Sequence, residues 1–245
     1  MSSRRIYRPQ SAASRLKSFT VAVKETDMWI AFSGSADVSC WPERVEQLVW
    51  KQRRQLESYL AQHPIFATAL EPCLVEPDAP LIVRSMAYAA NRAGVGPMAA
   101  VAGAMAEVVG LFLSGVFPEV IVENGGDIYI RVSEPVNVGI YAGNSPLSGK
   151  LALQIDPADT PLGICTSSGT VGPSLSMGSA DAAVVIASSA PLADAVATAM
   201  GNLVKNSSDL EKALEYACMI EGVNGALIIY RGKVAARGAV ELTSS

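Results

Sequence analysis

The chain has 245 residues, of which 50% are hydrophobic and 17% charged, and its formal net charge is −4 with a sequence pI near 5.1. The apolar fraction excludes a disordered protein, and the acidic balance disfavours a nucleic-acid surface, which needs clustered lysine and arginine. The length allows one large domain or two small ones, with a sizeable core. The four cysteines form no CxxC pair, so we expect reduced thiols in a cytoplasmic protein.

The first half of the chain predicts a β-hairpin followed by helices. Apolar and polar residues alternate on both sides of a polar break at 24–27, as in two paired strands. From Pro42 onward apolar residues recur at spacings of three and four, until His63-Pro64 ends the helix. The predicted elements are a hairpin over 19–33 and helices over 42–62, 81–92 and 97–113.

The second half predicts mainly strands, with an alanine-rich helix between them. Gly125-Gly126 joins two short apolar strands as a tight turn, and Arg231-Gly232 turns the last hairpin. A Ser/Thr/Gly-rich loop begins at Pro161. The predicted elements are two strands within 119–132, strands over 136–141, 151–155 and 182–187, a helix ending near 204, a helix capped by Asp209 or Ser208 and ending near 219, and a hairpin over 226–240. This order favours an α+β fold with mainly antiparallel sheet.

One apolar segment requires a decision about membranes. Residues 94–117 are about long enough to span a bilayer and include a single charge, Glu107. Gly96-Pro97 is typical of a helix start, and no Lys or Arg flank follows the segment to orient a spanning helix. We therefore expect a fully buried helix and no membrane partner.

Several reaction classes are disfavoured by what the sequence lacks. His63 is the only histidine and precedes a proline at a helix end, so a Ser-His-Asp or Cys-His arrangement would have to use it. No GxxxxGK[ST] loop is present, and neither glycine-rich stretch has the spacing of a dinucleotide fingerprint. Kinase-like and nicotinamide-dependent chemistry are thus disfavoured.

The alanine-rich helix offers a candidate metal site. Asp194 and Thr198 are four residues apart, so a helix places both side chains on one face, a turn apart. A carboxylate and a hydroxyl, helped by backbone carbonyls, suit a hard cation such as Mg²⁺. The alternative is structural, because an acid near a helix start is stabilised by the helix dipole and threonine can bond back to a carbonyl.

Two glycine-containing segments are candidates for ligand binding. In Asn124-Gly125-Gly126-Asp127 the glycines would let a ligand approach the backbone, while the flanking polar side chains recognise it; a simple tight turn is the alternative. Gly96, before an alanine-rich helix, offers free backbone N–H groups that suit a phosphate. The small residues Ala100, Gly103 and Ala104 of that helix would also allow another backbone to approach closely, which is the alternative reason for them.

The polar loop after residue 161 combines a thiol with hydroxyl groups. Cys165 is followed by Thr166, Ser167, Ser168 and Gly169. A reactive thiolate would need a helix N-terminus or a basic neighbour, and no base lies nearby in the sequence. A structural thiol is therefore the alternative to a catalytic Cys165.

Several motifs occur together in one order, namely AGAMAE at 102–107, VIVENGGDIYI at 120–130, GICTSSG at 163–169 and AAVVIASSAPLADAVATAM at 182–200, before a terminal hairpin. In this order they resemble the ApbE superfamily, whose founding members use Mg²⁺ to move FMN from FAD onto a protein threonine. The opening KETDMWI hairpin and the GPMAAVAGAMAE segment resemble its UPF0280 branch more closely. The likeness covers almost the whole chain. It implies a single domain over 1–245 with a T-fold-like α+β architecture, an antiparallel sheet with helices on one face.

The resemblance also implies roles for the candidate residues. Asp194 and Thr198 match the metal-ligating Asp and Thr of the family, and the segment around Ala102 matches the place that supplies a backbone carbonyl to the metal. The segment from Asn124 to Asp127 matches the Gly-Gly-Asp segment beside the flavin. FAD or FMN with Mg²⁺ is the expected ligand, with the 166–169 loop shaping the pocket and Asp181 as the base.

The chain departs from the transferases in the interval between the polar loop and the next strand. It reads TVGPSLSMGSAD, without the His-x-x-Asp-Pro-x-Thr-Gly block, and the lysine of the transferases' helix motif is absent. The sequence therefore predicts a protein that binds a flavin, nucleotide or other small anion with Mg²⁺, and it disfavours FMN transfer. A non-catalytic binding protein and a sulfur-handling accessory protein using Cys165 remain alternatives. The small apolar residues are consistent with a homodimer.

Overall fold

The computed structural model describes residues 15–34, 39–169 and 178–244. The helices are α1 (Trp41–Gln62), α2 (Pro64–Thr68), α3 (Leu81–Arg92), α4 (Val101–Ser114), α5 (Ala190–Leu203) and α6 (Leu210–Met219). The strands are β1 (Lys17–Val23), β2 (Thr26–Phe32), β3 (Val120–Asn124), β4 (Asp127–Arg131), β5 (Val136–Gly139), β6 (Leu151–Ile155), β7 (Leu162–Ser167), β8 (Ala182–Ala187), β9 (Val223–Tyr230), β10 (Lys233–Gly238) and β11 (Leu242–Ser244). The 3₁₀ turns described are η2 (Pro97–Ala100), η3 (Pro157–Asp159) and η4 (Ser207–Asp209).

The strands form two antiparallel sheets within the described residues. The larger sheet has eight strands in the order β1-β2-β3-β4-β7-β8-β9-β10, and the smaller has the order β11-β6-β5. Neighbouring strands in the large sheet follow one another in strand order, apart from the step between β4 and β7, but helices α1 to α4 lie between β2 and β3 in the chain and α5 and α6 between β8 and β9. The predicted α+β fold with mainly antiparallel sheet is therefore confirmed.

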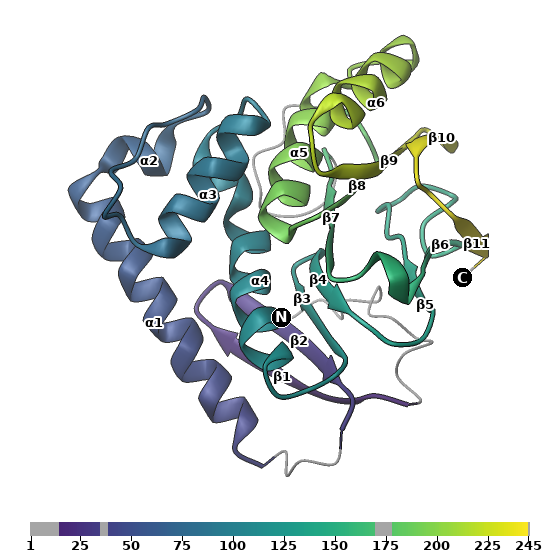
Figure 1. Cartoon of the computed structure of the whole chain (residues 1–245). Helices are drawn as coiled ribbons and strands as arrows, with labels where there is room; N and C mark the ends of the chain where they lie inside the picture. The colour runs from purple at the N-terminus through teal and green to yellow at the C-terminus, as the bar shows by residue number, and fades with distance from the viewer. Residues whose placement is uncertain (1–14, 35–38, 170–177, 245) are drawn as a thin grey trace.

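Helices cover one face of the large sheet and the small sheet covers the other (Figure 1). Strand β2 shows how the sequence sets this arrangement, because successive side chains of a strand point to opposite faces. Ile30 and Phe32 pack into the helix-side core, whereas Trp29 and Ala31 pack into the core under β5 and β6. A strand covered on both faces reads as a nearly continuous apolar run, as β2 does.

Some predicted boundaries were wrong. Residues 162–167, expected as a polar loop, form the central strand β7, because four of its residues are buried between neighbouring strands. The short elements α2 and β11 were missed, and β5 ends at Gly139 rather than 141. Helix α6 has Asp209 at its N-cap position, one of the two predicted, but without a side-chain cap hydrogen bond; Asn206 together with Asp209 caps the preceding 3₁₀ turn η4.

Helix α4 is only partly buried, contrary to the prediction of a fully buried helix. By length and composition Pro97–Ser114 could cross a membrane, and half of this segment is buried in the protein. Helices in the core of a protein can have the same length and composition. The outer face exposes Leu111 and Phe112, which are 57% and 40% accessible.

A partly buried ion pair connects the start of the described chain to the segment before β3. Arg15 Nη1 donates to both carboxylate oxygens of Glu119, at 2.6 and 2.5 Å, and the Ser133 amide donates to the same carboxylate at 2.9 Å. Glu119 is 4% exposed. Burial by itself would raise its pKa, but the hydrogen bonds from Arg15 and Ser133 outweigh burial and lower the pKa to about 2.

Candidate functional site

The first turns of α4 and α5 meet in front of the central strands. The Gly103 amide donates to Asp194 Oδ2 at 2.9 Å. A Cβ at Gly103 would lie 2.3 Å from the Ala190 carbonyl oxygen, so only glycine allows this approach. On β7, a Cβ at Gly163 would lie 2.3 Å from the Ala190 Cα. Two glycines far apart in sequence therefore fix the start of α5 between α4 and the sheet.

Each of these helices receives an N-terminal cap from the other. Neither Ala100, at the start of α4, nor Ser189, at the start of α5, makes a side-chain cap hydrogen bond. Asp194 on α5 accepts from the first turn of α4, and Glu107 Oε2 on α4 accepts the Ala190 amide at 2.6 Å. A carboxylate at a helix N-terminus satisfies free amides and interacts favourably with the helix dipole.

Asn124 links the end of β3 to the same turn of α4. Its Nδ2 donates to the Ala102 carbonyl oxygen at 3.0 Å, which fixes the carbonyl that the family resemblance assigns to the metal. Gly125 and Gly126 have φ of +73° and +108°, so the glycine pair does form a tight turn. Glu123 Oε1 accepts the Gly126 amide at 3.0 Å and holds this turn.

Asp127 and Cys165 lie opposite each other on β4 and β7, behind the helix starts. Asp127 is 8% exposed and Cys165 is fully buried. The Cys165 thiol donates to the Ala190 carbonyl at 3.3 Å, and it also interacts with the Asp127 carboxyl. We call Asp127, Asp194, Ala102, Asn124 and Cys165 the acid cluster.

Electrostatics distinguish the acid cluster from the rest of the interior. Burial, with the charge of Glu123, raises the pKa of Asp127 to about 7. Burial, with the charge of Asp127, raises the pKa of Asp194 above its usual range despite the Gly103 amide. Among the described residues, neither acid forms an ion pair with a lysine, arginine or histidine. The cluster therefore holds acidic groups without a cation of its own.

The thiol of Cys165 is poorly placed for nucleophilic chemistry. Burial raises its pKa well above the usual value, and the charges of Asp127 and Asp194 raise it further. A thiolate is the reactive form, so this environment keeps the thiol protonated and inert. The structural interpretation of Cys165 is favoured over the catalytic one.

The remaining candidate residues lie on α5 and at the end of β7. Thr198 is half-buried, one turn beyond Asp194 on α5. Thr166 and Ser167 are half-buried at the end of β7, and a Cβ at Gly201 of α5 would lie 3.6 Å from Ser167 Oγ. The end of β7 is thus close to the second half of α5. Ser168 Oγ donates to the Asp181 carbonyl at 2.8 Å, and Gly169 is exposed beyond it.

Two predicted site residues have other roles in the structure. Asp181 Oδ2 accepts the Arg231 amide at 2.7 Å, so it supports the β9–β10 turn, where Arg231 has a positive φ of 48°. Gly96 is buried under the preceding segment, and a Cβ there would lie 1.8 Å from the Ala69 carbonyl oxygen. The close approach that needs glycine at position 96 therefore comes from the chain itself.

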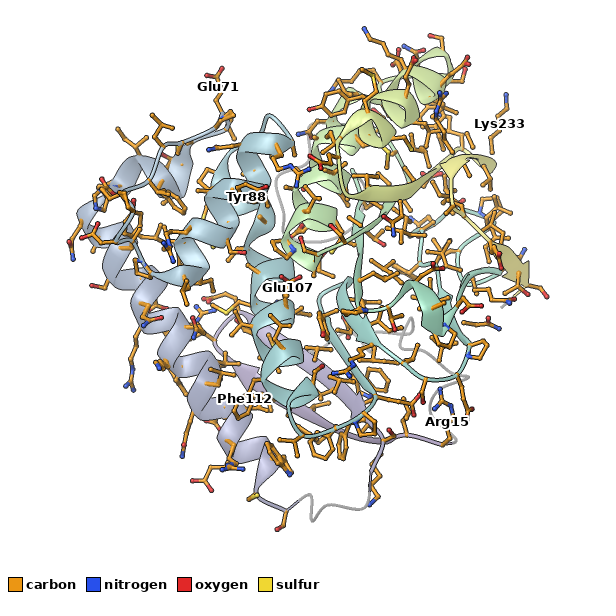
Figure 2. The ribbon with its side chains drawn as sticks, in the orientation of Figure 1. Arg15, Glu71, Tyr88, Glu107, Phe112 and Lys233 are labelled. Carbon is orange, nitrogen blue, oxygen red and sulfur yellow. The ribbon has the colours of Figure 1, made fainter. Side chains whose placement is uncertain are left out.

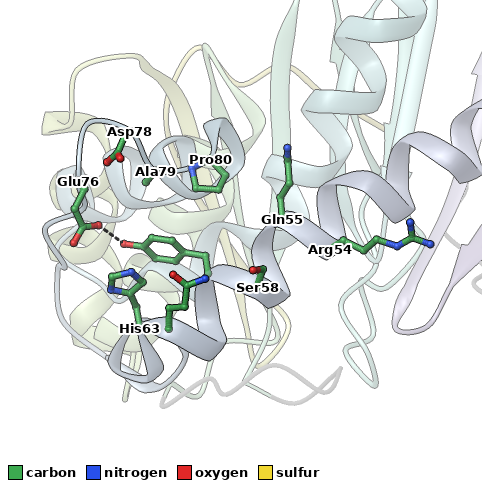
Figure 3. A pocket seen from close by; sticks show the side chains of 10 residues that line it. Arg54, Gln55, Ser58, His63, Glu76, Asp78, Ala79 and Pro80 are labelled. Atoms are coloured by element: carbon green, nitrogen blue, oxygen red, sulfur yellow. Dashed lines mark hydrogen bonds between the residues drawn. The ribbon is translucent and has the colours of Figure 1, made fainter.

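His63 lies in a separate surface pocket of about 570 Å³ between the end of α1 and residues 76–80 (Figure 3). Its ring stacks on Tyr59 at 4.2 Å, and the Tyr59 hydroxyl donates to Glu76 at 2.9 Å. None of the acid-cluster residues lines this pocket. The lining side chains are mostly exposed, and the hydroxyl of the buried Tyr59 is already paired with Glu76.

Sequence reasoning missed the parts played by Glu107 and Glu123. Figure 2 shows Glu107 between α4 and the start of α5. Glu123 is fully buried within the apolar strand β3. A glutamate inside an otherwise apolar strand or helix is the signal that was available, because buried acids are rare without partners.

The donor set is suited to Mg²⁺. Among the described residues, no group of three or more His, Cys, Asp or Glu side chains could hold a metal. Asp194, Thr198 and the Ala102 carbonyl would instead supply a carboxylate, a hydroxyl and a backbone oxygen. Mg²⁺ usually binds one or two protein carboxylates and completes its coordination shell with water and ligand phosphates. These three protein donors are therefore enough.

Comparison with known proteins gives the chain its relatives. The sequence model of the AbpE bacteria family matches residues 9–236. The chain is similar to a UPF0280 protein of Methanocella arvoryzae, with 47% identity over 78% of each chain. It is also similar to a UPF0280 protein of Methanocaldococcus jannaschii, with 39% identity over 90% of each chain.

Solved structures share the fold. The flavinyl transferase ApbE of Pseudomonas stutzeri in its apo form is 13% identical, with a TM-score of 0.56 over 91% of this chain and 94% of that one. The ApbE protein of Thermotoga maritima is 13% identical, with a TM-score of 0.54 over 92% of this chain and 96% of that one. At this identity the likeness shows a common fold.

Proposed function

The chain belongs to the AbpE bacteria family and to the UPF0280 proteins within it, and we propose that it binds a flavin nucleotide, FAD or FMN, together with Mg²⁺ at the acid cluster. Its fold is that of the ApbE flavin transferases. Asp194, Thr198 and the Ala102 carbonyl would hold the metal. Asn124, Asp127 and the 166–169 loop would contact the ligand.

The observation that carries the proposal is a pair of acids, the buried Asp127 and the half-buried Asp194, without a basic partner among the described residues. The charge of Asp127 raises the pKa of Asp194, and among the described residues no cationic side chain pairs with either acid. A burial of charge that is not compensated within the protein is costly. This energetic cost is offset when a bound cation, together with its ligand, supplies the missing positive charge.

The roles of the residues follow from their positions. Bound Mg²⁺ would neutralise phosphate charge on the nucleotide. Asn124 orients the Ala102 carbonyl, and the backbone amides of Gly103 and Ala102 hold the Asp194 carboxylate at the first turn of α4. Gly125 and Gly126, which their positive φ favours, have no side chains, so that a planar ring could approach the backbone of this turn.

A titration tests the proposal. Metal-stripped protein is titrated with FAD and with FMN, with and without Mg²⁺, and binding is followed by flavin fluorescence. We expect Mg²⁺-dependent binding that Asp194→Asn weakens about tenfold or more, because the variant loses the ligating charge. Asp159→Asn, an exposed acid in η3, is the matched control and keeps wild-type affinity. Equal affinity in the Asp194→Asn and wild-type proteins would refute the proposed site.

We further propose that the protein binds flavin without transferring FMN. The transferases' histidine block is missing from the interval 170–181, of which residues 170–177 lie outside the described residues. Incubation with FAD, Mg²⁺ and a threonine-containing acceptor from an ApbE substrate, followed by mass spectrometry, is expected to give no FMN adduct. An adduct would instead identify a transferase.

The sulfur-handling alternative receives no support from the buried, protonated Cys165 thiol. The homodimer and the cytoplasmic location stay predictions. Light scattering on the purified protein and fractionation of cells test them.

A further inference from the structure

The two helices that carry the acid cluster depend on each other at their first turns. Ala190 is the first residue of α5, and its amide has no cap from Ser189. Glu107, from the middle of α4, accepts that amide at 2.6 Å. Asp194 lies one turn further along α5 and reaches the Gly103 amide at 2.9 Å.

We propose that Glu107 is a positioning residue for the acid cluster. By accepting the Ala190 amide, Glu107 fixes the start of α5, and so places the Asp194 carboxylate against the first turn of α4 beside Ala102. The inference rests on the proposed function, because it assigns to Glu107 the geometry on which Mg²⁺-dependent flavin binding depends. Nothing in the family resemblance assigns this role to Glu107.

The packing around Ala190 transmits the position of Glu107 to Asp194. The Ala190 carbonyl is in contact range of Gly103 and accepts the Cys165 thiol, so this residue touches α4, β7 and the cluster. Because Asp194 follows in the next turn of the same rigid helix, a shift of Ala190 moves its carboxylate. The Glu107 bond crosses 83 positions of sequence and the Asp194 bond crosses 91, so the two bonds close one loop between the helices.

Two substitutions separate positioning from general stability. Glu107→Gln keeps an oxygen that can accept the Ala190 amide, whereas Glu107→Ala removes it. Residues that orient metal ligands typically contribute about ten- to one hundredfold to metal affinity. We expect Glu107→Ala to weaken Mg²⁺-dependent FAD binding by about that factor, and Glu107→Gln to retain most of it. Glu46→Ala, an exposed glutamate on α1, is the matched control and leaves binding unchanged.

A double variant tests whether Glu107 acts through Asp194. In the Asp194→Asn background, Glu107→Ala should cause no further loss of Mg²⁺-dependent affinity, because the carboxylate it positions is gone. A full, additive loss would overturn the inference, since Glu107 would then act independently. Equal loss in Glu107→Gln and Glu107→Ala would also overturn it.

Amide hydrogen exchange gives a readout that needs no ligand. Glu107→Ala is expected to speed exchange at Ala190, its direct partner, and also at Gly103, the partner of Asp194. Faster exchange at Ala190 with unchanged exchange at Gly103 would overturn the positioning role. Should wild-type protein bind no flavin with or without Mg²⁺, the proposed function fails, and exchange at Gly103 in Glu107→Gln and Glu107→Ala alone decides the positioning role.

Discussion

Glu119 and the acid cluster both place acidic side chains inside the fold, but the electrostatic partners of these side chains differ. Glu119 has Arg15 as a cation at 2.5 Å and a pKa of about 2 (Figure 2 labels Arg15). Asp127 and Asp194 have a thiol and backbone amides as partners, and their pKa values are raised. One region is electrostatically complete, whereas the other lacks a positive charge.

The difference indicates which region is built for stability and which for binding. A paired carboxylate stabilises the fold, because its folded pKa lies below its unfolded value. An acid with a raised pKa costs stability in its ionised form, and such acids concentrate at functional sites. The contrast therefore supports ligand binding at the acid cluster and a structural role for Glu119.

The close helix contact is the most sensitive part of the acid cluster. Gly103→Ala is expected to lower the free energy of unfolding by about 3 kcal/mol, since the added Cβ would lie 2.3 Å from the Ala190 carbonyl oxygen, a backbone atom that cannot move aside cheaply. Urea denaturation measures the change. Gly115→Ala, where the nearest atom is 3.5 Å away, is the matched control. A loss no larger than that of the control would mean that α4 and α5 are not tightly apposed.

The paired region gives the next largest effect, on acidification. The folded pKa of Glu119 is about 2 against an ordinary value of 4.5, so its contribution is complete above pH 4.5 and is lost as the pH falls toward 2. The difference corresponds to about 3 kcal/mol. Denaturation at a series of pH values should show stability falling across this window in wild type. Glu119→Gln should reduce the loss of unfolding free energy across this pH window. An unchanged pH dependence would show that Glu119 does not cause it.

Removal of the cation makes the paired region resemble the acid cluster. Arg15→Ala leaves the buried Glu119 carboxylate with hydrogen bonds from Ser133 and Ser33 but without a cation, and we expect a loss of about 2 kcal/mol in unfolding free energy. Thermal or urea denaturation at pH 7 measures it. Lys51→Ala, on the exposed side of α1, serves as the control. A loss below about 0.5 kcal/mol would show that the ion pair contributes no more than a surface pair.

The smallest effect is expected where the acid cluster loses a charge. Asp194→Asn keeps an oxygen for the Gly103 amide and removes a carboxylate that has no cationic partner. In metal-free buffer at pH 7 its unfolding free energy should stay within about 1 kcal/mol of wild type or rise. The same denaturation assay is used. A loss as large as that of Arg15→Ala would abolish the contrast between the two regions.

Local patterns in the sequence predicted much of the fold and part of the site. The spacing of Asp194 and Thr198, the Gly125-Gly126 turn and the helix 81–92 were readable because each depends on neighbours within a turn or a hairpin. The family resemblance predicted from motifs is confirmed by the relatives. The central strand β7 was not predicted, because its sequence contains polar residues and its burial depends on the neighbouring strands β4 and β8.

The sequence by itself determined the α+β class, the alternation that covers both faces of β2, and the identity of the family. The tertiary structure alone decided that Glu107 and Asp194 cap each other's helices, that Gly96 is covered by residue 69, and that Asp181 supports a turn instead of the acid cluster. The physical reason is separation along the chain. Periodicity reports contacts within a few residues, whereas these contacts join segments that only packing of the helices onto the sheet brings together.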